Sequence, residues 1–210
     1  MSDPQEILSF WFGPPAESPA EFDRKMQRWF IASPDLDREI IERFSDDVER
    51  ALAGELDAWR GELPARVALV VILDQLTRTI FRNTARAFAG DPMAQELVID
   101  LFDRGAHRQL DTEHRFAMIM PLLHAEDLAL QDRAGQLFAE LTAEVPPDYR
   151  PIYSMGDEQS RKYRDLIARF GRFPFRNQAL ERPSTPEEIE FLRDWSARKH
   201  PVGLRKAAGP

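Results

Sequence analysis

The chain has 210 residues, 43% of them hydrophobic and 10% aromatic, which is enough to bury one sizeable core. It contains no cysteine, and this excludes disulfides, thiolate metal sites, cysteine nucleophiles and iron–sulfur clusters. The formal net charge of −8 argues against a nucleic-acid-binding protein, because such proteins usually carry excess positive charge to neutralise phosphates.

Helix starts are marked by a capping side chain followed by proline at the first helical position. In chain order, this pattern and the hydrophobic periodicity predict helices that begin near Pro4, Pro19, Pro34, Pro64, Pro92, Thr112, Tyr149 and Pro186. Glycine or proline follows the end of most of them, as at Gly13, Gly54, Gly105, Pro146 and Gly171. Pro121 is expected to kink or restart the helix that begins near Thr112.

No stretch alternates polar and apolar residues as a β-strand would. We therefore predict an all-α fold of about nine helices in antiparallel hairpins, forming a single compact domain over residues 1–199. The last residues, 200–210, lack periodicity and are predicted to form a flexible tail. The N-terminus has no basic segment of a signal peptide, and the longest apolar run is too short to cross a bilayer. We expect a cytoplasmic protein with no membrane partner.

Four stretches carry a resemblance to a known family: ILSFWFG at 7–13, LDQLTRTIFRNTARAFAGDP at 73–92, PLLHAEDLALQ at 121–131 and FGRFPFRNQALERPSTPEE at 170–188. Over Ile7 to Trp195 the chain resembles a bacterial family catalogued as domain of unknown function 924, which is assigned to the TPR-like helical superfamily. The resemblance implies a TPR-like fold and no established activity. The family commonly reads DQFPRN at 74–79 and histidine at the positions of Tyr163 and Phe175, so no role of those histidines transfers to this chain.

The first candidate group lies in the second half of the most apolar segment. Asp74, Arg78 and Arg82 are four residues apart, which places them on one face of a helix. They could face a ligand. Alternatively, they form an internal network of ion pairs, because a buried arginine must be paired.

The second candidate group is His124, Asp127 and Gln131, at intervals of three and four residues. On a continuous helix they share one face, with Glu126 turned away. Histidine and aspartate at this spacing can ligate a metal, but the chain has only four histidines, so we predict neither a metal nor a cofactor. His124 and Asp127 are instead candidate catalytic residues, with His124 as a general base. The alternative is a hydrogen-bonded structural histidine.

The third candidate group lies in a basic region, because residues 161–176 hold six bases and one acid. Arg172 and Arg176 flank Pro174, and in an extended segment they would lie on one side, with Asn177 next to them. Guanidinium groups on a stiff loop suit a carboxylate or phosphate. An equally open alternative is a solvated basic loop that pairs with the acidic region 35–62.

Together these groups predict a helical binding protein whose arginines converge on one hollow with positive potential left over. Its partner would be a small anionic molecule or an acidic peptide. Two other interpretations stay open: an enzyme that uses His124 as base and arginines to clamp an anionic substrate, and a polar centre that only stabilises the fold.

Overall fold

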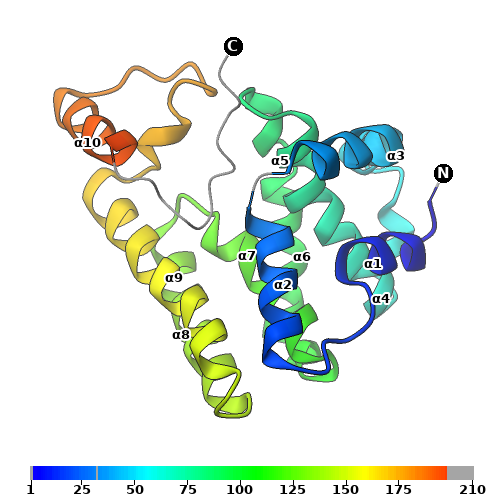
Figure 1. Ribbon diagram of the computed structural model, residues 1–210. Helices are drawn as coiled ribbons and strands as arrows, with labels where there is room; N and C mark the ends of the chain where they lie inside the picture. The colour runs from blue at the N-terminus through cyan, green and yellow to red at the C-terminus, as the bar shows by residue number, and fades with distance from the viewer. Residues whose placement is uncertain (1, 32, 198–210) are drawn as a thin grey trace.

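α-Helices joined by short 3-10 segments and loops form the computed structural model, which describes residues 2–31 and 33–197 (Figure 1). The α-helices are α1 (Pro4–Phe12), α2 (Pro19–Phe30), α3 (Pro34–Leu52), α4 (Leu63–Val70), α5 (Thr77–Ile80), α6 (Asp91–Asp103), α7 (Thr112–Leu123), α8 (Leu128–Glu144), α9 (Arg150–Phe170) and α10 (Pro186–Ala197). The described part contains no strand, which confirms the all-α prediction. The tail predicted for 200–210 lies outside the described residues.

The predicted capping side chains begin several of these helices. An oxygen of each accepts a hydrogen bond from the backbone N–H three residues later, in Asp3, Ser18, Ser33 and Asp111. Helix α6 differs, because Gly90 takes the capping position and Asp91 lies inside the first turn. The Asp91 carboxylate is therefore available to other partners.

The central helix is continuous from α4 through a π-helical segment, η2 (Val71–Leu76), into α5. In η2 the backbone N–H of Thr77 donates to the carbonyl of Ile72, five residues earlier. Residues 67–74 are all buried, because α1, α3, α6 and α7 surround this helix. The backbone at Gly90, before α6, packs directly against the backbone of Leu73 in the central helix. A Cβ atom on Gly90 would lie only 2.3 Å from the carbonyl oxygen of Leu73.

Helix α7 packs against α8, and α8 packs against α9. Helices α8 and α9 form the long antiparallel hairpin of Figure 1. Helix α7 continues through Pro121 and ends at Leu123, so a restart at Pro121 is wrong. A loop of residues 124–127 then leads into α8. The segment between α9 and α10 contains a short 3-10 helix, η5 (Pro174–Arg176), and α10 packs beside it. Within the described residues, none of these helices has the length and apolarity needed to cross a membrane.

Aromatic side chains of α1, α2, α7 and α9 form much of the core. Phe22 stacks on Tyr153 with 4.6 Å between ring centroids, and Phe116 contacts both rings edge-on. The core therefore joins the N-terminal helices to the α7–α9 layer. One cavity interrupts this packing, between the central helix, α2, α7 and α9.

Candidate functional site

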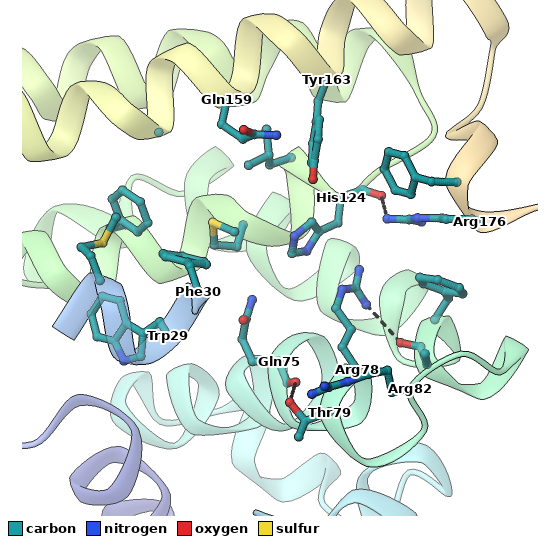
Figure 2. Close-up of a pocket in the computed structure, with 18 of the residues that line it drawn as sticks. Trp29, Phe30, Gln75, Arg78, Thr79, Arg82, His124, Gln159, Tyr163 and Arg176 are labelled. Atoms are coloured by element: carbon teal, nitrogen blue, oxygen red, sulfur yellow. Dashed lines mark hydrogen bonds between the residues drawn. The ribbon is translucent and has the colours of Figure 1, made fainter. Parts of the chain in front are cut away.

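The cavity has a volume of about 220 Å³ and is partly open to solvent (Figure 2). Aromatic and methionine side chains line one end, where Figure 2 shows Trp29 and Phe30. Polar side chains gather at the other end, namely Gln75, Arg78, Arg82, His124, Gln159, Tyr163 and Arg176. The cavity therefore has an apolar end and a polar end.

Asp74, in the π-helical segment η2, anchors the polar end although it is only 1% exposed. Its carboxylate accepts hydrogen bonds from His124 Nδ1 at 2.8 and 3.0 Å and from Gln75 Nε2 at 2.6 Å. Arg78 Nη2 lies 3.4 Å away. Burial opposes ionisation of Asp74, but His124, Arg78 and these hydrogen bonds lower its pKa from 3.8 to about 2. Asp74 is therefore ionised at neutral pH.

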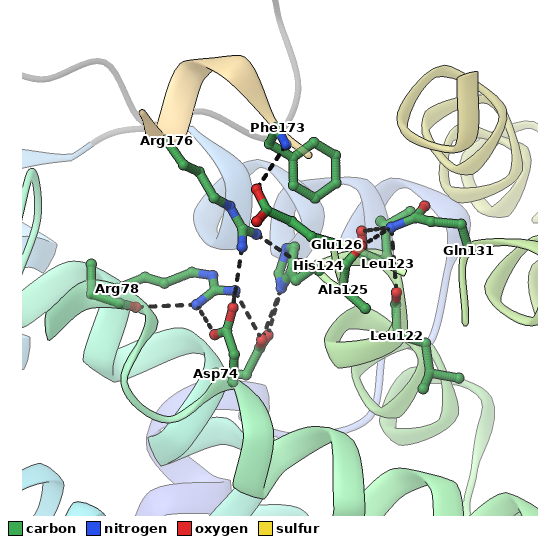
Figure 3. Close-up of polar contacts among 12 residues, drawn as sticks. Asp74, Arg78, Leu122, Leu123, His124, Ala125, Glu126, Gln131, Phe173 and Arg176 are labelled. Carbon is green, nitrogen blue, oxygen red and sulfur yellow. Dashed lines mark hydrogen bonds and ion pairs between the residues drawn. The ribbon is translucent and has the colours of Figure 1, made fainter. Parts of the chain in front are cut away.

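His124 follows the last residue of α7 and points into the cavity (Figures 2 and 3). Because Asp74 is an acceptor, the Nδ1 atom of His124 carries the proton that it donates. Burial lowers the pKa of His124 and the charge of Arg78 lowers it further, against the opposing effect of Asp74, so the ring is neutral at neutral pH. The Nε2 atom has no hydrogen-bond partner in the part of the chain that the structure describes. It presents a lone pair to the cavity.

Two arginines from distant parts of the chain, Arg78 and Arg176, share the carboxylate of Asp91. Arg78 donates to both Asp91 oxygens, at 2.6 and 3.0 Å, and Arg176 Nη1 donates to one at 3.3 Å. The Arg176 guanidinium lies between the rings of Phe88 and Phe173, 4.5 and 4.7 Å from their centroids. Burial and the charge of Arg78 lower the pKa of Arg176 to about 10. Asp91 thus holds the guanidinium groups of both arginines beside the cavity.

The third arginine of the cavity, Arg82, forms an ion pair with Asp37 of α3 at 2.9 Å. Each guanidinium at the polar end is therefore paired with a carboxylate, as Arg78 and Arg176 are with Asp91. Arg78, Arg82 and Arg176 do converge on the cavity, as expected. The positive potential expected there is largely cancelled by Asp91 and Asp37. With His124 neutral, the charges of this end sum to zero.

The wall formed by residues 172–182 is held to the body of the protein by Glu126. This carboxylate accepts the backbone N–H of Phe173 at 2.7 Å and two hydrogen bonds from Arg182, at 2.6 and 2.9 Å. Burial opposes ionisation of Glu126, but Arg182 and Phe173 lower its pKa below the ordinary value. Arg176 adds a second tie, because its Nη2 donates to the backbone carbonyl of His124 at 2.8 Å.

The comparisons place the chain among proteins without a known activity. The model of the family described as "Bacterial protein of unknown function (DUF924)" matches residues 7–195. The chain belongs to this family. It is also similar to the solved structure of a protein of unknown function from Agrobacterium tumefaciens, with 31% identity and a TM-score of 0.75 over 91% of this chain and 97% of that one. No curated protein matches.

In this family member, Tyr163 and Phe175 both line the cavity. Burial raises the pKa of Tyr163, so its hydroxyl stays protonated. This part of the wall therefore offers a phenol hydroxyl and an apolar aromatic ring.

The prediction that His124, Asp127 and Gln131 share one helix face is wrong, because α7 ends before them and α8 begins after Asp127. Asp127 caps α8 by accepting the N–H of Leu130 at 2.9 Å. Gln131 is fully buried and donates at 2.7 Å to the carbonyls of Leu123 and, likewise, Ala125. Asp127 is thus not the carboxylate that orients His124. Glu126, predicted to turn away, instead binds the 172–182 wall.

The prediction that Arg172 and Arg176 lie on one side of an extended segment is also wrong, because η5 is helical. Arg172 pairs with Glu188 at 2.7 Å, and Asn177 donates to the same carboxylate at 3.3 Å, so both lie away from the cavity. In the part of the chain that the structure describes, the ion pair of Arg172 is with Glu188 and not with the acidic region 35–62. Of the predicted site residues, the cavity end brings together Asp74, Arg78, Arg82, His124 and Arg176.

Sequence reasoning missed Asp91 and Glu126, the two carboxylates that organise the arginines. Asp91 resembled a helix cap because proline follows it, and Glu126 resembled an exposed helical residue. A signal existed for Asp91: it lies at the end of the 73–92 stretch, which holds three arginines, and buried arginines need carboxylate partners. Among the described residues, no three histidine, aspartate or glutamate side chains gather into a metal site.

Proposed function

We propose that this chain binds a small organic acid with a flat apolar body in the cavity between the central helix, α2, α7 and α9. The observation that carries the proposal is the division of one cavity into an aromatic end and a polar end. The polar end holds three arginines and the Nε2 atom of His124, which has no hydrogen-bond partner among the described residues. Pockets for small ligands typically combine apolar walls with a few convergent polar groups.

The size of the cavity supports a small molecule rather than an acidic peptide. A cavity of roughly 150 Å³ already holds a benzene molecule. The volume of about 220 Å³ therefore has room for one aromatic ring and a short acidic arm. The ring would lie against Trp29 and Phe30, and the acidic group near Arg78, Arg176 and His124.

The charges support a weak acid rather than a phosphate. The arginines are held by Asp91 and Asp37, so the polar end has no large positive excess to offer a dianion. Among the described residues, the buried Nε atom of Arg176 has no hydrogen-bond partner, so the donor capacity of this guanidinium is not fully used by the protein. The lowered pKa of Arg176, about 10, reflects a guanidinium that a further negative charge would stabilise.

Phenylacetate is a suitable probe, with acetate as the ligand that lacks the apolar body. At 100 times its dissociation constant, phenylacetate should stabilise the protein by about 2.7 kcal/mol, a rise of roughly 5 to 11 °C in Tm. Acetate at the same concentration should produce no comparable rise. An equal response to both ligands, or to neither, would contradict the proposal.

A cavity-filling variant locates the binding site. Ala179 lies in the wall and is only partly buried, so Ala179→Trp should fill the cavity without removing an ion pair and abolish the phenylacetate response. Ala139→Trp is the matched control, because Ala139 is exposed on α8 and does not line the cavity. Unchanged binding by Ala179→Trp would place the ligand elsewhere.

A catalytic role is the second candidate, favoured by the pairing of His124 with Asp74. A buried, ionised Asp74 orients a neutral imidazole whose Nε2 can accept a proton. With phenylpyruvate, Nε2 would take a proton from C3, while the electron pair moves to the carbonyl oxygen as an enolate near the arginines. Loss of the C3 proton signal in D₂O, abolished by His124→Asn, would support this role.

A further inference from the structure

We propose that the cavity takes up a monocarboxylate together with one proton, and that Nε2 of His124 receives this proton. The inference rests on the proposed function, because it concerns the ionisation of the same site. Its physical basis is the charge balance of the polar end. Without ligand, the guanidinium groups of Arg78 and Arg176 balance the carboxylates of Asp74 and Asp91, and Arg82 balances Asp37.

A carboxylate that enters this end would leave one negative charge uncompensated. Asp74 is 1% exposed and Arg176 has an 8% exposed side chain, so little water reaches these groups. An unpaired charge in such surroundings is costly, and proteins usually neutralise it by a change of protonation. The site therefore favours one additional positive charge when the anion is bound.

His124 is the group that can supply this charge. The titratable and charged groups around it come from η2, α5, α6, α9, η5 and the 124–127 loop, and they are Asp74, Arg78, Asp91, Tyr163, Arg176 and Glu126. The arginines are already charged and Tyr163 already holds its proton. Protonation of Asp74 or Asp91 would remove the negative charge of that carboxylate. It would therefore break its ion pairs and weaken the hydrogen bonds that it accepts.

The geometry suits a proton on Nε2. Nδ1–H already donates to both oxygens of Asp74, so protonation creates an imidazolium beside a fixed carboxylate without moving the ring. The new Nε2–H then points into the cavity as a charge-assisted donor for the ligand. His124 would lie between two carboxylates, one from the protein and one from the ligand.

Linkage gives the expected pH dependence. Above the His124 pKa of the free protein and below that of the complex, one proton enters with each ligand, so the dissociation constant of phenylacetate should fall about tenfold for each pH unit of acidification. Above the pKa of the complex this dependence should vanish. Phenylacetamide, which is neutral and nearly the same shape, should bind without taking up a proton.

Isothermal titration calorimetry tests the inference with the full chain. Titrations of phenylacetate at about pH 7, in two buffers with different ionisation enthalpies, should give an uptake of about one proton per ligand. His124→Asn keeps a side-chain donor for Asp74 but cannot titrate, so it should bind phenylacetate more weakly, with no proton uptake. Circular dichroism would verify that this variant is folded.

Each outcome bears on a separate claim. Absence of phenylacetate binding between about pH 5 and 8 would overturn the proposed function and this inference together. Binding with no proton uptake by the wild type would overturn only the inference. Proton uptake that persists in His124→Asn, or that accompanies phenylacetamide, would overturn the assignment to His124.

Discussion

Replacing Asp74 by asparagine removes the charge at the centre of the polar network while keeping the side-chain volume. Asp74 is 1% exposed and holds both His124 and Arg78. Removing one partner of a buried charge pair typically costs about 3–5 kcal/mol. Arg78 keeps its two hydrogen bonds to Asp91, so we expect the lower end, about 3 kcal/mol.

Urea denaturation at neutral pH measures this loss. With an m-value of roughly 2–3 kcal/mol/M, the midpoint of Asp74→Asn should fall by at least about 1 M. Asp103→Asn is the control, because the Asp103 side chain is 61% exposed in its ion pair with Arg133, and such pairs contribute less than about 1 kcal/mol. A loss in Asp74→Asn no larger than in this control would refute the view of a buried, coupled network.

The pH dependence of the same difference provides a second check. The pKa of Asp74 is about 2 in the folded protein and 3.8 ordinarily, so the ionised carboxylate stabilises the fold in full above about pH 5. This contribution, about 2 kcal/mol, is lost as the pH falls through 3.8 towards 2. The stability difference between wild type and Asp74→Asn should therefore shrink over that interval. A constant difference would show that ionisation of Asp74 is not the source of the lost stability.

Three further predictions concern packing and the cavity wall. Gly90→Ala should destabilise the fold by about 1–3 kcal/mol or more in urea denaturation, because its Cβ would meet the Leu73 carbonyl oxygen at 2.3 Å. Gln131→Leu should cost about 1–3 kcal/mol in the same assay, because it leaves buried carbonyls at the end of α7 without donors. Glu126→Gln should weaken the tie to Arg182 and increase amide hydrogen exchange in residues 172–182, with little change in α1.

Gly61→Ala is the control for Gly90→Ala. Gly61→Ala should leave the stability nearly unchanged, because its Cβ would have only an ordinary contact at 3.9 Å. Equal effects of the two glycine substitutions would argue against the close approach at Gly90. An unchanged midpoint for Gln131→Leu would mean that its hydrogen bonds are replaceable. Unchanged exchange in Glu126→Gln would mean that Arg176 alone holds the wall.

The helices were predictable because capping is local. Ser18 and Ser33 are followed by proline, and each accepts the expected backbone N–H. Thr185 and Glu188 form a capping box, because Glu188 accepts the N–H of Thr185 at 2.7 Å and the Thr185 hydroxyl accepts the N–H of Glu188. At Ser18, however, Glu21 binds the N–H of the preceding residue rather than that of Ser18. The TPR-like arrangement implied by the family resemblance stays a prediction.

The errors in the site arose where the chain departs from regular geometry without a sequence signal. The helix ends after Leu123 although neither glycine nor proline occurs in residues 124–127. Pro174 stiffens its segment as expected, but the φ angle of proline suits a 3-10 turn as well as an extended strand. Convergence of Arg78 and Arg176 on Asp91 depends on packing between distant helices, which local spacing cannot give.

The π-helical segment Val71–Leu76 has a consequence for how the chain tolerates deletions. Its wide turn accommodates one residue more than an α-helix would, and each residue of an α-helix rotates the chain by roughly 100°. Deleting Gln75 or Leu76 would let the central helix become regular, yet it would place Arg78 three positions after Asp74 instead of four, which in an α-helix differs by roughly 100°. A shortened chain could thus keep its helices while losing the alignment between the carboxylate of Asp74 and the guanidinium four positions later.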